Sequence, residues 1–76
     1  MVRVGRIDEL MHHNNGSTTG RIKQISGEGG NQEYYFDLPT DQVNFRLYDH
    51  VTFDPAGVTG INQGGEHLKA IEIHIK

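Results

Sequence analysis

The sequence carries a strong turn signal near its start, Asn14-Asn15-Gly16. Apolar residues recur mostly with a period of two on both sides of it, in residues 2–11 and 18–26. Asn-Gly between two such runs is typical of a β-hairpin, because both residue types accept the positive φ of a tight turn. The stretch therefore predicts that the chain begins with two antiparallel strands.

Three further strand-like runs follow, at residues 33–38, 48–54 and 68–76. The segment between the first two predicts a short helical turn, and residues 55–67, with four Gly and one Pro, predict a long mobile loop before the last strand. Five short antiparallel strands suit a small closed or partly open barrel, because closure removes exposed strand edges. We therefore expect an all-β, five-stranded antiparallel barrel, with a five-stranded sandwich as the alternative.

Two breaks in the alternation predict β-bulges. Ile22 and Ile25 lie three residues apart, so we expect a bulge or an early strand end between them. In the last strand three isoleucines share one parity and are expected to face the same way: Ile71, Ile73 and Ile75. Leu68 and Ala70 have the opposite parity, which implies a second bulge.

Length and charge limit the possible functions. The 76 residues allow one domain, residues 1–76. Seven Lys and Arg stand against ten Asp and Glu, which gives a formal net charge of −3. This balance excludes a broadly basic nucleic-acid binder, since phosphate affinity comes largely from clustered Lys and Arg. A local basic stripe remains possible.

The chain has no Cys, so it has neither a disulfide scaffold nor a thiol nucleophile. No run approaches the roughly 18 apolar residues of a membrane span, and no charged-then-apolar leader opens the sequence. We therefore expect a cytoplasmic protein with no membrane partner.

Short motifs along the chain carry a family resemblance: Val4-Gly5-Arg6-Ile7, Thr18-Thr19-Gly20-Arg21-Ile22, Glu33-Tyr34-Tyr35-Phe36-Asp37-Leu38, Leu47-Tyr48-Asp49-His50-Val51-Thr52-Phe53 and Ala70-Ile71-Glu72-Ile73. In kind and order they resemble the cold-shock domain, a five-stranded barrel of the OB-fold class that binds single-stranded nucleic acid. The resemblance spans nearly the whole chain. The positions that build the barrel in that family largely match: Gly5, Ile7, Gly20, Ile22, Val51, Phe53 and Ala70.

The positions that face nucleic acid in that family are mostly replaced. The family's Lys-Trp pair corresponds to Asp8-Glu9, its two second-strand Phe correspond to Thr19 and Arg21, and its third-strand Phe corresponds to Tyr35. Base stacking contributes about 1–3 kcal/mol per base, so the loss of most aromatics weakens binding strongly. The resemblance thus implies weak, largely sequence-tolerant binding of single-stranded RNA or DNA.

Five residues form what we call the candidate face: Arg6, Thr19, Arg21, Lys23 and Tyr35. Alternation along a strand sends Arg21 and Lys23 to the same side, and it sends Tyr35 to the side opposite Tyr34 and Phe36. The cations would neutralise phosphates, the Tyr35 ring would stack on one base, and Thr19 would offer a hydroxyl. Arg3 and Tyr48 are further candidates.

The same residues also allow two other interpretations. They can be ordinary solvated strand residues that discourage edge pairing. They can also form a protein–protein or homodimer interface, because Tyr and Arg are enriched at interface centres. The net negative charge and the acidic replacements at Asp8, Glu9 and Asp37 favour a protein partner over phosphate.

No motif indicates a metal site, a cofactor or catalysis. His12 and His13 are adjacent and point oppositely on a strand, and the other three His are scattered. The acidic residues are dispersed, with no nucleophile–base spacing among them. Gly27-Glu28-Gly29-Gly30 lacks the Lys-Ser/Thr of a phosphate loop. We expect a binding protein and not an enzyme.

Overall fold

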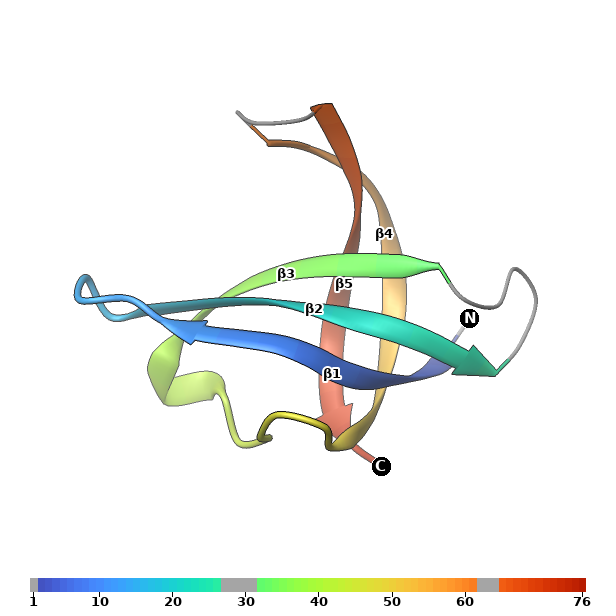
Figure 1. Cartoon of the computed structure of the whole chain (residues 1–76), viewed down its shortest axis with the longest axis horizontal. Coiled ribbons are helices and arrows are strands. Elements are labelled where there is room, and N and C mark those ends of the chain that lie inside the picture. The colour runs from blue at the N-terminus through green and yellow to red at the C-terminus, as the bar shows by residue number, and fades with distance from the viewer. Residues whose placement is uncertain (1, 27–31, 62–64) are drawn as a thin grey trace.

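A computed structural model of the chain describes residues 2–26, 32–61 and 65–76 and forms a closed β-barrel (Figure 1). Its five strands are β1 (Arg3–His12), β2 (Ser17–Ser26), β3 (Glu33–Pro39), β4 (His50–Ile61) and β5 (Gly65–Ile75). A single 3-10 turn, η1 (Thr40–Gln42), stands between β3 and β4 where the sequence predicts a helical turn. None of the helical structure in the described residues is long and apolar enough to cross a membrane.

The strand order around the barrel is β1-β2-β3-β5-β4, with β4 returning to β1. Four pairings are antiparallel, as expected, but β3 and β5 are parallel, so the prediction of a wholly antiparallel sheet is wrong. The reason is geometric. Strand directions alternate from β1 to β3 and again from β1 through β4 to β5, so β5 must run the same way as β3.

The predicted hairpin joins β1 and β2. The backbone N–H of His13 donates to the carbonyl of Ser17 at 2.8 Å, which closes the turn. Gly16 has a φ of +85°, the left-handed conformation that glycine accepts without a Cβ penalty. The Asn15 side-chain oxygen accepts hydrogen bonds from the backbone N–H and the hydroxyl of Ser17, at 3.1 and 2.7 Å. The hairpin is therefore where the sequence predicts it, but of the Asn-Gly pair only Gly16 has a positive φ, and Asn15 acts through its side chain.

The first predicted bulge lies at Ile25. The β1–β2 register runs from Val4↔Ser26 to Gly5↔Gln24, which leaves Ile25 without a cross-strand partner in this pairing. Ile25 is 46% exposed, while the Gln24 side chain is completely buried. Two-residue alternation from the buried Ile22 already sends Gln24 inward and Ile25 outward, and the register shift comes only after Gln24.

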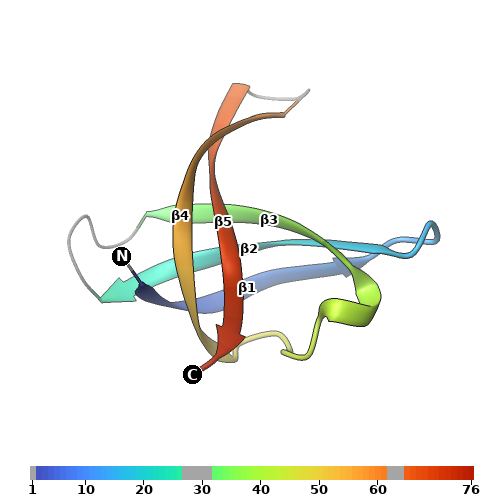
Figure 2. The same ribbon diagram turned by 180° about the vertical axis from the view of Figure 1, so that it is seen from behind.

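The prediction of a long loop over residues 55–67 is wrong. β4 continues to Ile61 and β5 begins at Gly65, and only residues 62–64 of that segment lie outside the described part. Gly57 has a φ of +90° and lies where the register shifts between Pro55 and Val58, so β4 carries one extra residue there. Glycine at positive φ and proline are both compatible with a bulge. The two strands form a hairpin that extends beyond β3 (Figures 1 and 2).

The second predicted bulge is present in β5, but it lies at Glu72. This residue has a φ of +53°, and the β4–β5 register gains one residue on β5 between His74 and Ile71. Ala70 and Ile73 are buried, whereas Ile71 and Ile75 are 41% and 50% exposed. The expectation that all three isoleucines share one face is therefore wrong, because the bulge reverses parity between Ile71 and Ile73.

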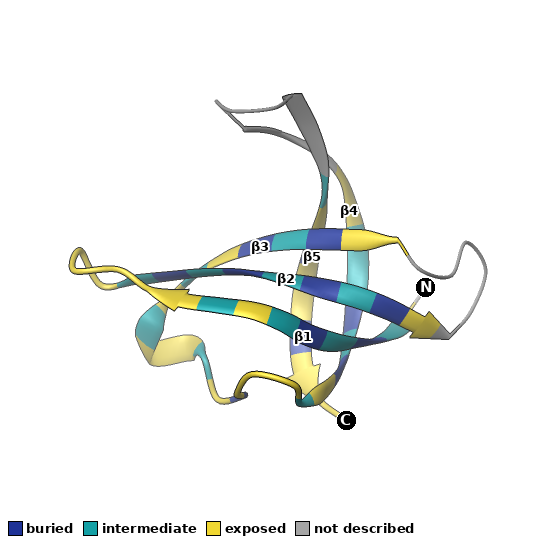
Figure 3. Ribbon diagram, in the orientation of Figure 1, coloured by how far each residue is buried: buried dark blue, intermediate teal, exposed yellow. Residues whose placement is uncertain are grey.

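Buried residues alternate with more exposed ones along the strands (Figure 3). The buried apolar side chains of the core are Ile7, Ile22, Tyr34, Phe36, Phe45, Val51, Phe53, Ala70 and Ile73. Two ring pairs link distant segments: Tyr34 with Phe53 at 4.9 Å between centroids, and Phe36 edge-on to Phe45 at 5.5 Å. Burying one such side chain contributes about 1.5–3 kcal/mol.

Gly20 allows β1 and Phe36 to approach β2 closely. A Cβ at this position would overlap the carbonyl oxygen of Glu9 and lie 2.6 Å from Cζ of Phe36. The main clash is with backbone, which cannot rotate aside as a side chain can.

We expect Gly20→Ala to lower the free energy of unfolding by about 1–3 kcal/mol, the usual cost of overpacking a core. Urea denaturation followed by circular dichroism measures this. The matched control is Gly57→Asn, because nothing lies within 4 Å of a Cβ at Gly57 and Asn tolerates its positive φ. Equal stability of Gly20→Ala and the wild type would show that the barrel relaxes around the added methyl group.

Candidate functional site

All five residues of the candidate face lie on the outer side of three neighbouring strands. Arg6 is on β1, Tyr35 is on β3, and the other three are on β2. Their chain neighbours on β2 and β3 point inward, as the burial of Ile22, Tyr34 and Phe36 shows. The predicted alternation at Tyr35 is therefore present, and its ring is half-buried on the outer surface.

Tyr35 stands between two cationic residues. It is directly opposite Arg21 on β2 and, through the parallel pairing, opposite Lys69 on β5. Cross-strand neighbours have Cβ atoms about 4.5–5.5 Å apart in antiparallel pairs, and, besides the larger effect of Glu9, an electrostatic interaction with Tyr35 is among the causes that raise the pKa of Arg21. This row places one aromatic surface next to a cation on each side.

A second row of paired residues crosses β1, β2 and β3, two residues further along β2. Arg6 is opposite Lys23, and Lys23 is opposite Glu33. Thr19 lies further along β2, opposite Asp37, and its hydroxyl is hydrogen-bonded to His13 Nε2 at 2.8 Å. The structure thus brings the five residues onto one side of the barrel, with Thr19 towards the β1–β2 turn.

The two arginines of the candidate face are held by carboxylates. Arg6 Nε lies 2.7 Å from Asp8 Oδ1, and this hydrogen bond and the charge of Asp8 raise the pKa of Arg6. Arg21 Nε lies 3.2 Å from Glu9 Oε1, and Arg21 also faces Glu33 at 3.7 Å. The charge of Glu9 is the main reason why the pKa of Arg21 is raised.

Charges of both signs are interleaved on this side of the barrel. The strand registers place four cationic residues here, Arg6, Arg21, Lys23 and Lys69, with four acidic residues among them, Asp8, Glu9, Glu33 and Asp37. Their formal charges cancel, and both arginines of the set have a carboxylate oxygen within 3.2 Å. An anionic ligand must therefore compete with the chain's own carboxylates.

Sequence reasoning missed Lys69. The expected pattern has Ile71, Ile73 and Ile75 facing the core, and Lys69 lies on the same alternation, so its side chain would also point inward. The expected antiparallel sheet would not place it beside Tyr35 either. The bulge at Glu72 and the parallel β3–β5 pairing together bring it to the outer surface. The sequence did contain a signal for this position. If Leu68 and Ala70 face the core, as their alternation indicates, Lys69 between them faces outward.

The two further candidates lie apart from the Tyr35 row. Arg3 donates a hydrogen bond to the side-chain oxygen of the buried Gln24 at 3.0 Å and contacts the Tyr34 hydroxyl at 3.4 Å, so it belongs to a polar cluster at one end of the core. Tyr48 is 65% exposed and has a φ of +72°. Its backbone N–H donates to the carbonyl of Ile7 at 2.7 Å, which fixes this turn against β1.

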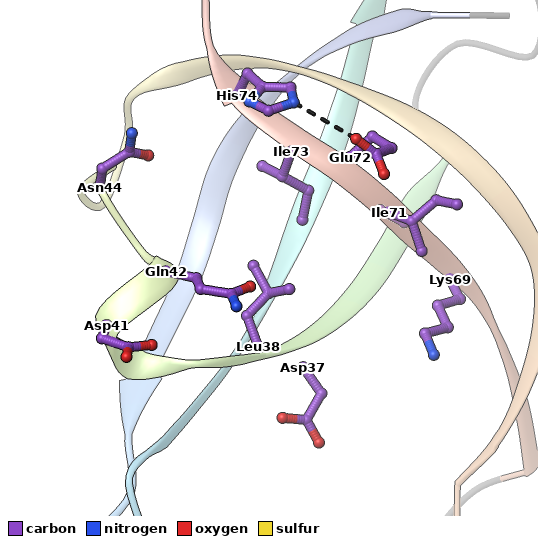
Figure 4. Close-up of a pocket in the computed structure, with 11 residues that line it drawn as sticks. Asp37, Leu38, Asp41, Gln42, Asn44, Lys69, Ile71, Glu72, Ile73 and His74 are labelled. Atoms are coloured by element: carbon purple, nitrogen blue, oxygen red, sulfur yellow. Dashed lines mark ion pairs between the residues drawn. The ribbon is translucent and has the colours of Figure 1, made fainter.

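A groove that the sequence did not predict lies between β5 and the segment formed by β3 and η1 (Figure 4). Its volume is about 620 Å³. Asp37 and Lys69 stand at one end of it, where it meets the outer side of the barrel (Figure 4). Figure 4 also shows the ion pair between His74 and Glu72, at 3.7 Å.

Within the described part of the chain, no group of three or more His, Cys, Asp or Glu side chains could hold a metal ion. Comparisons with protein-family models, with curated proteins and with solved structures find no match to this chain. Inferences about function therefore depend on the residues themselves and on their geometry.

We expect Glu9→Gln to lower the free energy of unfolding by less than about 1 kcal/mol, because exposed ion pairs contribute little. The Glu9 and Arg21 side chains are 46% and 33% exposed. Urea denaturation at low and high salt measures the effect. A loss above about 2 kcal/mol would show instead that this pair is needed to hold β1 against β2, well beyond the usual range for exposed pairs.

Proposed function

We propose that this chain is an OB-fold-like barrel, similar to the cold-shock domain, that binds single-stranded RNA or DNA weakly through the candidate face and Lys69. OB-folds bind oligonucleotides on the face of their second and third strands and with the loops between strands one and two and strands four and five. Four of the five candidate residues lie on β2 and β3. On this proposal, the β1–β2 turn and the β4–β5 hairpin would take the places of those two loops.

The observation that carries the proposal is the position of Tyr35 between Arg21 and Lys69 on adjoining strands. An aromatic ring offers a stacking surface for a base, and flanking cations can contact the phosphates on either side. Stacking accepts every base, so binding of this kind is largely sequence-tolerant. The action would be reversible binding that keeps a strand unpaired, with no chemical step.

Two features make the proposed binding weak. The candidate face contains one aromatic ring, so it stacks one base. Its two arginines are already paired, since Arg6 contacts Asp8 and Arg21 contacts Glu9 and Glu33. A phosphate must replace these carboxylates. The free energy of binding gains only the difference between the arginine–phosphate and the arginine–carboxylate interaction, which are similar.

The direct test is an NMR titration of the full chain with oligo-dT and oligo-U at low salt. We expect amide shifts along β2 and β3 around Arg21 and Tyr35. Tyr35→Leu should weaken binding about 5- to 150-fold, which corresponds to the roughly 1–3 kcal/mol of one stacked base. Tyr48→Leu removes an exposed ring outside the row and should have little effect. No shifts at millimolar oligonucleotide, or equal losses in both variants, would refute the proposal.

A protein or self-assembly interface on the same face is a second candidate function, and the interleaved carboxylates favour it. The two functions differ in how strongly the binding affinity depends on salt concentration. For single-stranded nucleic acid, a plot of the logarithm of affinity against the logarithm of salt concentration has a slope of about −0.7 for each phosphate that the protein neutralises.

The double variant Glu9→Gln with Glu33→Gln frees Arg21 from both of its carboxylates. If the ligand is nucleic acid, we expect tighter binding and a steeper salt dependence, by up to about 0.7 in slope for the added phosphate contact. Fluorescence anisotropy with labelled oligo-dT at several salt concentrations measures both. Unchanged oligonucleotide binding, with self-association seen by light scattering, would support the protein interface instead.

A further inference from the structure

The groove between β3 and β5 exists because these two strands separate. Their parallel pairing covers only Tyr34↔Leu68 and Tyr35↔Lys69. Beyond those pairs β3 continues into η1 while β5 runs on beside β4, and the groove of about 620 Å³ lies between them (Figure 4). This volume is within the range of roughly 300–1,000 Å³ that is typical of ligand sites.

Aliphatic side chains line part of the groove, beside the amide side chains of Gln42 and Asn44 (Figure 4). Ile73 is buried in the core, and Leu38 packs against the core while remaining partly exposed. Ile71 is 41% exposed, because the bulge at Glu72 turns it away from the interior. An apolar group that enters the groove would therefore cover Leu38 and Ile71.

Acidic side chains line its edges. Asp37 at the end of β3 and Asp41 on η1 are both exposed, and within the described residues neither forms an ion pair. Glu72 lies across the groove on β5 and faces His74 at 3.7 Å. Lys69 is the one lysine among the lining residues, so three carboxylates stand against one permanent positive charge. The groove lining therefore has an excess of negative formal charge, which favours a cationic ligand.

We propose that this groove binds a short basic segment of a partner protein, in which a Lys or Arg side chain is next to an aliphatic one. The cationic group would lie between Asp37 and Asp41, and the aliphatic group would cover Leu38 and Ile71. This pairing follows from charge complementarity at the edges and from the aliphatic part of the lining. The groove adjoins the candidate face at Asp37 and Lys69, but its other lining residues lie outside that face, and the inference does not depend on nucleic-acid binding.

The test uses two acetylated and amidated tetrapeptides, Lys-Ile-Lys-Ile and Glu-Ile-Glu-Ile, titrated into the isotope-labelled full chain. They have equal aliphatic content and opposite charge. We expect saturable amide shifts at Leu38, Ile71 and Ile73 with the basic peptide and none with the acidic one. No oligonucleotide is present, so the result is separate from that of the candidate face.

Variants locate the contacts. Asp37→Asn with Asp41→Asn should weaken the basic peptide about tenfold, and Ile71→Ser should weaken it independently. Both changes are at exposed positions, so the amide spectrum of each variant should remain that of a folded barrel. Glu9→Gln with Glu33→Gln is the matched control, because it removes the same charge from another part of the surface and should leave affinity nearly unchanged.

Three outcomes would overturn the proposal. The first is the absence of shifts with the basic peptide at millimolar concentration. The second is equal binding of both peptides, which would show that charge plays no part. The third is an equal loss in the aspartate variant and in its control, which would show a general attraction of a basic peptide to an acidic protein.

Discussion

A closed sheet with an odd number of strands must contain a parallel pair, because directions cannot alternate all the way around such a ring. In this barrel the parallel pair is β3 and β5, and its register is only two residue pairs long. Both functional proposals depend on that junction. The paired part places Lys69 beside Tyr35, and the unpaired part opens the groove below it. One topological requirement thus produces two chemically different surfaces on neighbouring parts of the barrel.

Bulges adapt the strands to this closed shape. Ile25 in β2, Gly57 in β4 and Glu72 in β5 each lie at a register shift, and a bulge increases the local twist of a strand. The bulge at Glu72 also decides which side chains face outward. Ile71 becomes part of the groove because of it, and Ile73 takes the core position. Local backbone geometry therefore sets the chemistry of the surface here.

Much of the fold follows from local sequence signals. The Asn-Gly turn predicted the first hairpin, and the alternation through Tyr34, Tyr35 and Phe36 predicted which ring faces outward. These signals succeed because a turn and a two-residue period depend on near neighbours in the chain. The segment after Pro55 was different. Its glycines looked like a mobile loop, whereas the pairing of β4 with β5 makes them part of two long strands.

The parts that sequence did not predict depend on contacts between distant segments. The neighbour of Tyr35 across β5 depends on the closure of the barrel, and the groove depends on where β3 turns into η1. No periodic pattern within one strand contains that information. The carboxylates beside Arg6 and Arg21 were visible in the sequence, but only the registers show that Glu9 and Glu33 flank one guanidinium.

The pairing of Arg21 with two carboxylates also affects the lifetime of any anionic complex on that face. The guanidinium already has two counterions supplied by the chain itself, at 3.2 and 3.7 Å. When a bound anion begins to dissociate, Glu9 and Glu33 can form their ion pairs with Arg21 again immediately, because they are part of the same chain and need not diffuse to it. Such internal competitors accelerate release, so occupancy would be brief and would rise only with ligands that offer several negative groups at once.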